Sequence, residues 1–318
     1  MKKSGWIIIV GIIILSLLIY KIGLENIFNT LKNFNLLFLP LIIIVLIISY
    51  ILAGINIWVL IKPYKKISIL KPIKYVFFTL FYSSFTPGKI ADFFMIFYLK
   101  KNKLSVSKST IITIFDKIIS LILKSLLGIV GAIFILKRFD LLTLGVPIIM
   151  IFLLIFLFIF LSSRKLRDLI KKFILRKYSK IFKGFSKDLK KYIKNNKKEL
   201  FYNLLITLVK TIFETALLYL LFLSFGQSIN FIKILLIFSL LSIISFIAFP
   251  IGISGFGIRE ALGIIMYSTI NVDPAIVFSS YMIRLLLIYV INLLTFIYYP
   301  SELNLIKKYN FLKKVRFK

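Results

Sequence analysis

The chain has no cysteine and no histidine among its 318 residues. Their absence removes thiol nucleophiles, disulfides, imidazole bases and the commonest protein ligands of metal ions. Carboxylate, lysine, arginine and hydroxyl groups remain for any chemistry. The sequence therefore excludes an intramembrane metalloprotease and a histidine-based transferase, and we expect neither a metal ion nor a cofactor.

The chain also has few long polar stretches. Hydrophobic residues make up 60% of it, far above the fraction in soluble domains. Five stretches are long enough to cross a bilayer, and a shorter one near the N-terminus lacks the small-residue cleavage site of a signal peptide. They are Gly5–Tyr20, Leu36–Ile61, Thr110–Leu136, Leu141–Ser162, Leu200–Phe225 and Pro274–Tyr299. The sequence predicts an all-α, polytopic membrane helix bundle that forms one integral membrane domain over residues 1–318.

Acidic residues are few, with 11 against 43 basic residues and a net charge of +32. Thirty-two of the basic residues fall at the N-terminus, in 62–74, in 100–108, in 164–198 and in the tail at 300–318, whereas five lie in the opposite connections. This bias is typical of cytoplasmic loops, not of a nucleic-acid surface. We therefore expect a multi-pass protein of the cell (plasma) membrane with both termini in the cytoplasm and no nucleic-acid partner.

Two apolar segments must begin and end on the same side of the membrane in this topology. Tyr75–Leu99 lies between two basic loops, and its arms around Pro87-Gly88-Lys89-Ile90-Ala91-Asp92 are too short for full spans. Phe231–Ile270 begins and ends outside and contains the second glycine-rich break, from Pro250 to Glu260. We predict six spanning helices and two re-entrant hairpins, or up to eight transmembrane segments if both hairpins are full helix pairs.

The order helix, hairpin, helix therefore occurs twice, at 36–136 and at 200–299, in opposite orientations. Each break is followed at the same distance by a basic residue in a long apolar helix: Lys117 lies 29 residues after Gly88, and Arg284 lies 29 residues after Gly255. Inverted repeats with broken helices are a common architecture of transporters. The alternative is that both breaks are ordinary kinks.

Ten ionisable residues lie within the apolar stretches, where charge is costly and usually lines a cavity or pathway. Lys210 and Glu214 are placed to pair on one helix face. The interior holds six cations and four anions, an excess that suits an anionic ligand such as a phosphate. The cations are Lys89, Lys117, Lys124, Lys210, Arg259 and Arg284, and the anions are Asp92, Asp116, Glu214 and Glu260. The alternative is that Lys89, Lys124 and Glu260 lie near the interface.

The glycines Gly252, Gly255 and Gly257 allow backbone conformations in which successive N–H groups point into one concavity. If Arg259-Glu260 opens a short helix, its N-terminus faces the same concavity and favours an anion.

The cytoplasmic segment 163–199 is strongly basic and has apolar residues at helical spacing, including Phe185, Leu189 and Tyr192. This pattern predicts an amphipathic helix on an anionic membrane surface. The alternative is a solvated basic loop.

These motifs resemble the transmembrane region of the lysylphosphatidylglycerol synthase/flippase family. Phe85-Thr86-Pro87-Gly88-Lys89-Ile90-Ala91-Asp92 is similar to a motif of the family's first half, and Ser254-Gly255-Phe256-Gly257-Ile258-Arg259-Glu260-Ala261 to one of its second half. Asp116-Lys117 lies where an acidic–arginine pair is expected, and Arg284 also falls in a familiar place. Ala91 replaces a usual glycine, and Met95 stands where arginine is common.

The resemblance implies a role with anionic lipids or dolichol-linked sugars, but no aminoacyl-transferase domain is present. We favour translocation of an anionic membrane lipid or a polyprenyl-phosphate-linked substrate. The expected substrate-binding residues are Lys89, Asp92, Asp116, Lys117, Gly255, Gly257, Arg259, Glu260 and Arg284. The alternatives are a membrane enzyme or accessory factor in polyprenyl-phosphate-linked glycan or lipid modification, with Asp92, Asp116 or Glu260 as base, and a passive assembly scaffold.

Overall fold

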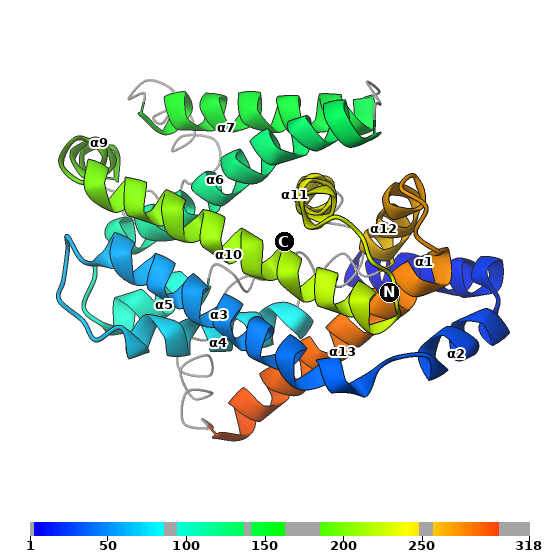
Figure 1. The fold of residues 1–318 in the computed structure, drawn as a ribbon. Coiled ribbons are helices and arrows are strands. Elements are labelled where there is room, and N and C mark those ends of the chain that lie inside the picture. The colour runs from blue at the N-terminus through cyan, green and yellow to red at the C-terminus, as the bar shows by residue number, and fades with distance from the viewer. Residues whose placement is uncertain (1–2, 86–93, 137–140, 163–184, 248–256, 299–318) are drawn as a thin grey trace.

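A computed structural model describes residues 3–85, 94–136, 141–162, 185–247 and 257–298 (Figure 1). Three of the predicted site residues, Lys89, Asp92 and Gly255, lie outside these ranges, as does the tail at 300–318. The described ranges are helical and contain no strand, which confirms the predicted all-α class.

The helices follow the apolar stretches closely. They are α1 (Lys3–Ile22), α2 (Leu24–Lys32), α3 (Leu39–Ile61), α4 (Leu70–Phe85), α5 (Phe94–Lys101), α6 (Val106–Gly131), α7 (Val146–Ser162), α9 (Phe185–Asn195), α10 (Lys197–Ser224), α11 (Phe231–Ile247), α12 (Ile258–Ser268) and α13 (Pro274–Tyr298).

Four helical stretches are long and apolar enough to cross a membrane, and they match four of the six predicted spans. They are Leu36–Ile61, Val106–Leu136, Lys197–Ser224 and Pro274–Thr295. The first predicted span corresponds to α1, which bends by 79° into α2. The bend falls at Gly23, whose positive φ of 89° suits glycine. The predicted span at 141–162 contains a shorter apolar helix, Thr143–Ile155. The full count of six spans stays a prediction.

The helices α4 and α5 correspond to the two arms of the first predicted hairpin, whose turn lies outside the described residues. Its two arms meet at their bases, where the rings of Tyr75 and Tyr98 stack with centroids 4.9 Å apart. The Asn102 amide, just after α5, donates a hydrogen bond of 2.8 Å to the Tyr75 hydroxyl. The segment therefore begins and ends at one level, as a re-entrant hairpin requires.

The helix pair α11 and α12 forms the second predicted hairpin and returns in the same way to the end of α10. Phe231, at the start of α11, contacts Tyr219, and Tyr267, near the end of α12, contacts Phe222. Both ends of this hairpin therefore lie beside the last turns of α10.

The two halves repeat the same packing. In the centre of Figure 1, α3 and α10 lie side by side, and each contacts the first helix of its own hairpin. The first hairpin helix of each half also packs on the last helix of the other half, α4 on α13 and α11 on α6. This reciprocal exchange is the pattern expected if the halves are related by a pseudo-two-fold axis.

Helix boundaries agree with the same relation. Lys117 and Arg284 are 167 residues apart, as are Gly88 and Gly255. A shift of 167 carries the bounds of α5 and α6 to 261–268 and 273–298, close to α12 and α13 at Ile258–Ser268 and Pro274–Tyr298. The inverted repeat stays a prediction, which this correspondence supports.

Glycines allow the closest helix contacts. A Cβ added to Gly54 of α3 would lie 2.4 Å from the Cα of Ile73 in α4. On α6, Gly128 and Gly131 face the backbone of α11 at Leu240 and Leu236, where added Cβ atoms would meet atoms at 3.1 and 3.0 Å. Small residues at such contacts let helices gain van der Waals packing where lipid gives no hydrophobic drive between them.

The amphipathic helix α9 binds the protein, not a membrane, through its apolar face. Phe185, Leu189 and Tyr192 are buried in a cluster with residues of α3, α4, α5 and α6. The interpretation that this face lies on the membrane surface is therefore wrong for the described part of the segment, because neighbouring helices already cover it. The lysines on the other face remain exposed.

Tyr192 anchors α9 to the end of α3. Its hydroxyl donates a hydrogen bond of 2.9 Å to the Leu60 carbonyl, and its ring stacks on Tyr64 and Phe115. Burial raises the pKa of Tyr192 well above its ordinary value, so the hydroxyl keeps the proton that it donates.

The topology can be tested with single cysteines, since the chain has none of its own. An impermeant thiol reagent added to intact cells should label Ser228→Cys, after α10, and should reach Lys187→Cys, on α9, only after lysis. Both positions are exposed. External labelling of position 187 and not of 228 would reverse the predicted orientation.

The glycine contact predicts a loss of stability in Gly54→Ala. Its Cβ would collide with the Ile73 backbone, which cannot rotate away, so we expect a cost of about 1–3 kcal/mol and a lower midpoint of thermal unfolding in detergent. Gly128→Ala is the matched control, because its closest approach is 3.1 Å and the expected loss is smaller. An equal or larger loss in Gly128→Ala would contradict this account.

Candidate functional site

Charged side chains from three helices lie at matching depths. Glu214 is ten residues before the end of α10, Arg284 is ten residues after the start of α13, and Lys124 is twelve residues before Leu136, where the α6 stretch ends. At about 1.5 Å per residue, these side chains lie about 15–18 Å from those helix ends. Half of a hydrocarbon core of about 30 Å is similar, so the three charges lie near the bilayer midplane.

Lys124 and Glu214 form an ion pair of 2.8 Å between α6 and α10. The predicted ion pair between Lys210 and Glu214 within α10 is therefore wrong. Because α6 packs against α10, the ammonium of Lys124 reaches the carboxylate directly from the neighbouring helix. Lys210 and Arg284 still act on Glu214 electrostatically.

The ring of Phe238 on α11 lies between two cations. Lys124 Nζ is 5.2 Å from its centroid, and the Arg284 guanidinium carbon is 5.4 Å from it. Cation–π contacts of this kind are worth about 0.5–2 kcal/mol each. Phe238 therefore joins α6, α11 and α13 around one electropositive centre.

Arg284 is buried, with 9% of its surface exposed. Within the described ranges, its Nε and Nη1 atoms have no hydrogen-bond partner. Ser280, one helical turn earlier on the same face, is fully buried, and its Oγ also has no partner among the described residues. A guanidinium and a hydroxyl on one face of α13 thus have donors that no described residue uses.

The start of α12 lies close to this cluster. Arg259 acts electrostatically on Arg284, and Tyr281 of α13 interacts with Arg259 and Glu260. Because α12 packs on α13, with Gly263 against the ring of Tyr281, the structure places Gly257, Arg259 and Glu260 on the helix next to the one that carries Arg284.

Gly257 and Glu260 have a structural role in this arrangement. The Gly257 amide donates a hydrogen bond of 2.6 Å to the Glu260 carboxylate, which caps the first turn of α12. The glycine pattern predicted that this amide points into an open concavity. For Gly257 the prediction is wrong, because its N–H group is bound to Glu260. Gly257 has a φ of +88°, and an added Cβ would lie 2.6 Å from the Gly11 carbonyl oxygen of α1, so both conformation and packing favour glycine.

A second polar layer joins α3, α6 and α10. The Asn56 amide donates hydrogen bonds of 2.9 Å to both the Asp116 carboxylate and the Thr207 hydroxyl. Asn203 donates to the Asn56 carbonyl at 3.3 Å. All four side chains are buried.

Asp116 is therefore part of a helix-joining network and is not beside Arg284. It is eight residues before Lys124 on α6, which corresponds to about 12 Å along the helix. Lys117, adjacent to Asp116, is half-buried at the same level. The structure separates this predicted pair from the cluster around Arg284.

Sequence reasoning did not single out Asn56, Phe238 or Ser280 as site residues. Asn56 carried a usable signal, since it is a polar residue within a span that has no charged side chain. Phe238 is one of 33 phenylalanines, and its contact with two cations depends on three helices meeting.

Removal of the Asp116 carboxylate should reduce stability and leave ligand binding intact. Asp116→Ala leaves the buried Asn56 amide without this acceptor, which costs about 1–3 kcal/mol. Asp116→Asn keeps an acceptor oxygen and should lose less. Thermal unfolding and headgroup binding measured on the same samples check this, and a stable Asp116→Ala variant without binding would place Asp116 in the ligand site.

Comparison with known proteins gives one family match and no match among curated proteins. The family is described as the lysylphosphatidylglycerol synthase TM region, and the match covers residues 6–295. This range includes both glycine-rich breaks and every helix of the charged cluster, which agrees with the resemblance seen in the motifs. Together with its long apolar helices, the match shows that the chain is a multi-pass integral membrane protein that belongs to the lysylphosphatidylglycerol synthase transmembrane-region family.

Proposed function

We propose that this protein translocates an anionic lipid or a lipid-linked phosphate across the cell membrane. The phosphate would bind near the bilayer midplane to Arg284, with Ser280, Lys124 and Arg259 around it. The observation that carries this proposal is the buried Arg284 guanidinium, whose Nε and Nη1 have no hydrogen-bond partner in the described part of the chain.

The energy of burying Arg284 supports a role in ligand binding. An arginine at the centre of a membrane helix costs about 2.5–3.5 kcal/mol on insertion scales and more in simulations. The contact with Phe238 offsets about 0.5–2 kcal/mol. A bound phosphate would supply charge-assisted and bidentate hydrogen bonds, which are among the strongest in proteins.

The charge of the cluster points to the same ligand. Lys124, Lys210, Arg259 and Arg284 are its cations, and Glu214 and Glu260 are its carboxylates. Because Glu214 pairs with Lys124 and Glu260 caps α12, neither carboxylate forms an ion pair with Arg284. An anion with one or two negative charges would balance the remaining excess.

The position of the cluster favours transport over a fixed structural role. Lys124 comes from the first predicted repeat, and Glu214, Phe238, Arg259 and Arg284 come from the second. Transporters built from inverted repeats bind substrates near the midplane where the two repeats meet. A site there is equally far from both surfaces, as a lipid headgroup crossing the membrane requires.

The substrate class follows from the surroundings and from the family. Apolar helices surround the cluster, so lipid tails can stay in hydrocarbon while the phosphate enters. The family description names a phosphatidylglycerol derivative, whose headgroup is attached through a phosphate. By their place in the first predicted repeat, Lys89, Asp92 and Lys117 are proposed as further contacts along the path, and Gly255 as part of the second hairpin's turn.

Arg284→Ala should weaken binding of the anionic headgroup by about one to two orders of magnitude, because a charge-assisted contact is worth about 1.5–3 kcal/mol. Arg284→Lys should recover part of the affinity, since it keeps the charge and loses the bidentate fork. Binding is measured on purified protein, and translocation of a labelled phosphatidylglycerol in reconstituted vesicles. Mass spectrometry of the same vesicles detects any covalent change, which would indicate an enzyme.

Lys32→Ala is the control, because Lys32 is exposed at the end of α2, a helix that contributes no residue to the cluster. Normal folding with unchanged headgroup affinity in Arg284→Ala would remove this residue, and the phosphate site with it. If Arg284→Ala misfolds and a second change of a carboxylate, Glu214→Gln or Asp92→Asn, restores folding, Arg284 is a structural partner of that carboxylate.

A further inference from the structure

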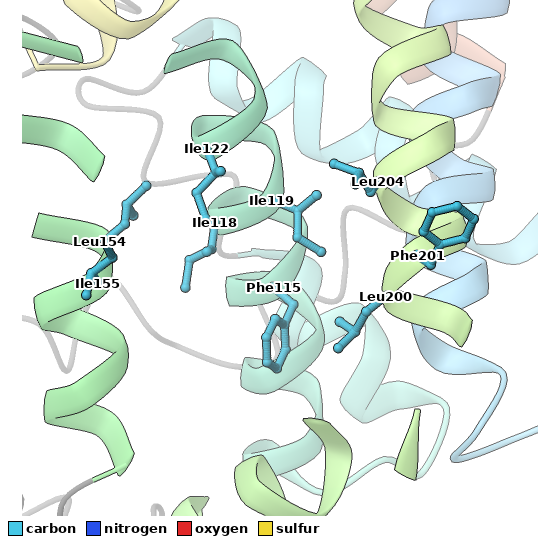
Figure 2. Close-up of a pocket in the computed structure, with 9 residues that line it drawn as sticks. All are labelled: Phe115, Ile118, Ile119, Ile122, Leu154, Ile155, Leu200, Phe201 and Leu204. Atoms are coloured by element: carbon cyan, nitrogen blue, oxygen red, sulfur yellow. The ribbon is translucent and has the colours of Figure 1, made fainter. Parts of the chain in front are cut away.

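An apolar groove lies between α6, α7 and α10, and no charged residue of the cluster lines it. Figure 2 shows α6 in the centre, with Leu154 and Ile155 of α7 on one side and Leu200, Phe201 and Leu204 of α10 on the other. Side chains of Phe115, Ile118, Ile119 and Ile122 form the α6 wall. None of the lining residues is polar, and none comes from α11, α12 or α13.

The groove has the size and shape of a binding site for part of a lipid. Its volume is about 480 Å³, within the range of about 300–1,000 Å³ usual for small-molecule pockets. The lining residues on α6 cover about 10 Å of helix. At one end, Ile118, Ile122 and Leu154 continue into a cluster with Met150 of α7 and Ile243 of α11, so this end is packed.

The opposite end of the groove meets a basic surface. Helix α9 packs against all three groove helices, and the ring of Phe115 stacks on Tyr192 of α9 with centroids 5.5 Å apart. The exposed lysines of this end are Lys187, Lys190, Lys191, Lys194, Lys197 and Lys198. Lys197 lies three and four residues before Leu200 and Phe201, so it shares their face of α10.

We infer that this groove binds one acyl chain of an anionic glycerophospholipid from the leaflet beside α9, with the phosphate on Lys197 and Lys198. The apolar groove, packed at one end, suits the acyl chain of such a lipid. The lysines at its other end suit the phosphate. A neutral lipid would fill the groove without using the lysines. The bound lipid is a resident ligand of the α6–α7–α10 groove, distinct from a headgroup at Arg284, and it does not depend on the proposed translocation.

Photocrosslinking of the unmodified full-length protein tests the location. Phosphatidylglycerol with a diazirine in one acyl chain is incorporated into nanodiscs, irradiated, and mapped by peptide mass spectrometry. We expect crosslinks concentrated in 115–122, 154–155 and 200–204, and competition by unlabelled phosphatidylglycerol about tenfold better than by phosphatidylcholine. Crosslinks spread evenly over other exposed positions, such as Leu286 and Leu293 of α13, would overturn the inference.

Variants test the two halves of the site separately, with retained phosphatidylglycerol counted by native mass spectrometry. Ile119→Trp fills the groove and should abolish retention, whereas Ile265→Trp, at an exposed position of α12 outside the groove, should not. The double variant Lys197→Gln and Lys198→Gln should reduce the preference for phosphatidylglycerol over phosphatidylcholine by on the order of tenfold. Lys32→Gln and Lys233→Gln, at exposed lysines of other connections, are the matched controls.

The outcomes separate this site from the transport site. Arg284→Ala should keep the retained lipid, so loss of translocation with normal retention leaves the groove assignment intact. Unchanged retention in Ile119→Trp would overturn the assignment. An unchanged headgroup preference in the double lysine variant would overturn it as well. If Ile119→Trp does not fold, the crosslinking map of the unmodified protein decides.

Discussion

A charge near the middle of a bilayer must be compensated by its surroundings, and much of this structure can be understood from that requirement. Lys124 is compensated by Glu214 through an ion pair of 2.8 Å, and Glu260 by the amide of Gly257. Arg284 has the ring of Phe238 but no hydrogen-bond partner for Nε or Nη1 within the described residues. The arrangement compensates Lys124, Glu214 and Glu260 internally, and the remaining positive charge around Arg284 is the physical basis of the proposed phosphate site.

The two polar layers of the bundle, one around Asn56 and one around Arg284, differ in how their hydrogen-bond donors are used. The layer around Asn56 joins α3, α6 and α10 through hydrogen bonds that use its donors internally, which suits a rigid element. About 12 Å further along α6, in the layer around Lys124 and Arg284, donors of Arg284 have no partner among the described residues, which suits binding. The proposed transport would use both layers. A rigid framework keeps the cations of the headgroup site from pairing with nearby carboxylates.

Basic residues also serve more than one purpose. Some of the lysines that set the predicted orientation by their number also lie near one end of the apolar groove, where Lys197 precedes the lining residue Leu200 by about one helical turn. The apolar face of α9 packs on the bundle and fixes these lysines beside the groove. The predicted orientation and the inferred lipid binding would therefore use the same charges, since a cytoplasmic basic surface attracts anionic lipids.

The sequence alone determined the membrane class, the all-α architecture and the family, because apolar length, charge bias and the two glycine motifs are local properties of the chain. It also predicted that Arg259, Glu260 and Arg284 share one site, and this site stays a prediction. Only the tertiary structure decided the partners: Glu214 pairs with Lys124 and not with Lys210, Asp116 with Asn56, and the apolar face of α9 with the bundle. Such contacts depend on which helix faces come together, and helix periodicity fixes the faces of one helix but not the identity of its neighbour.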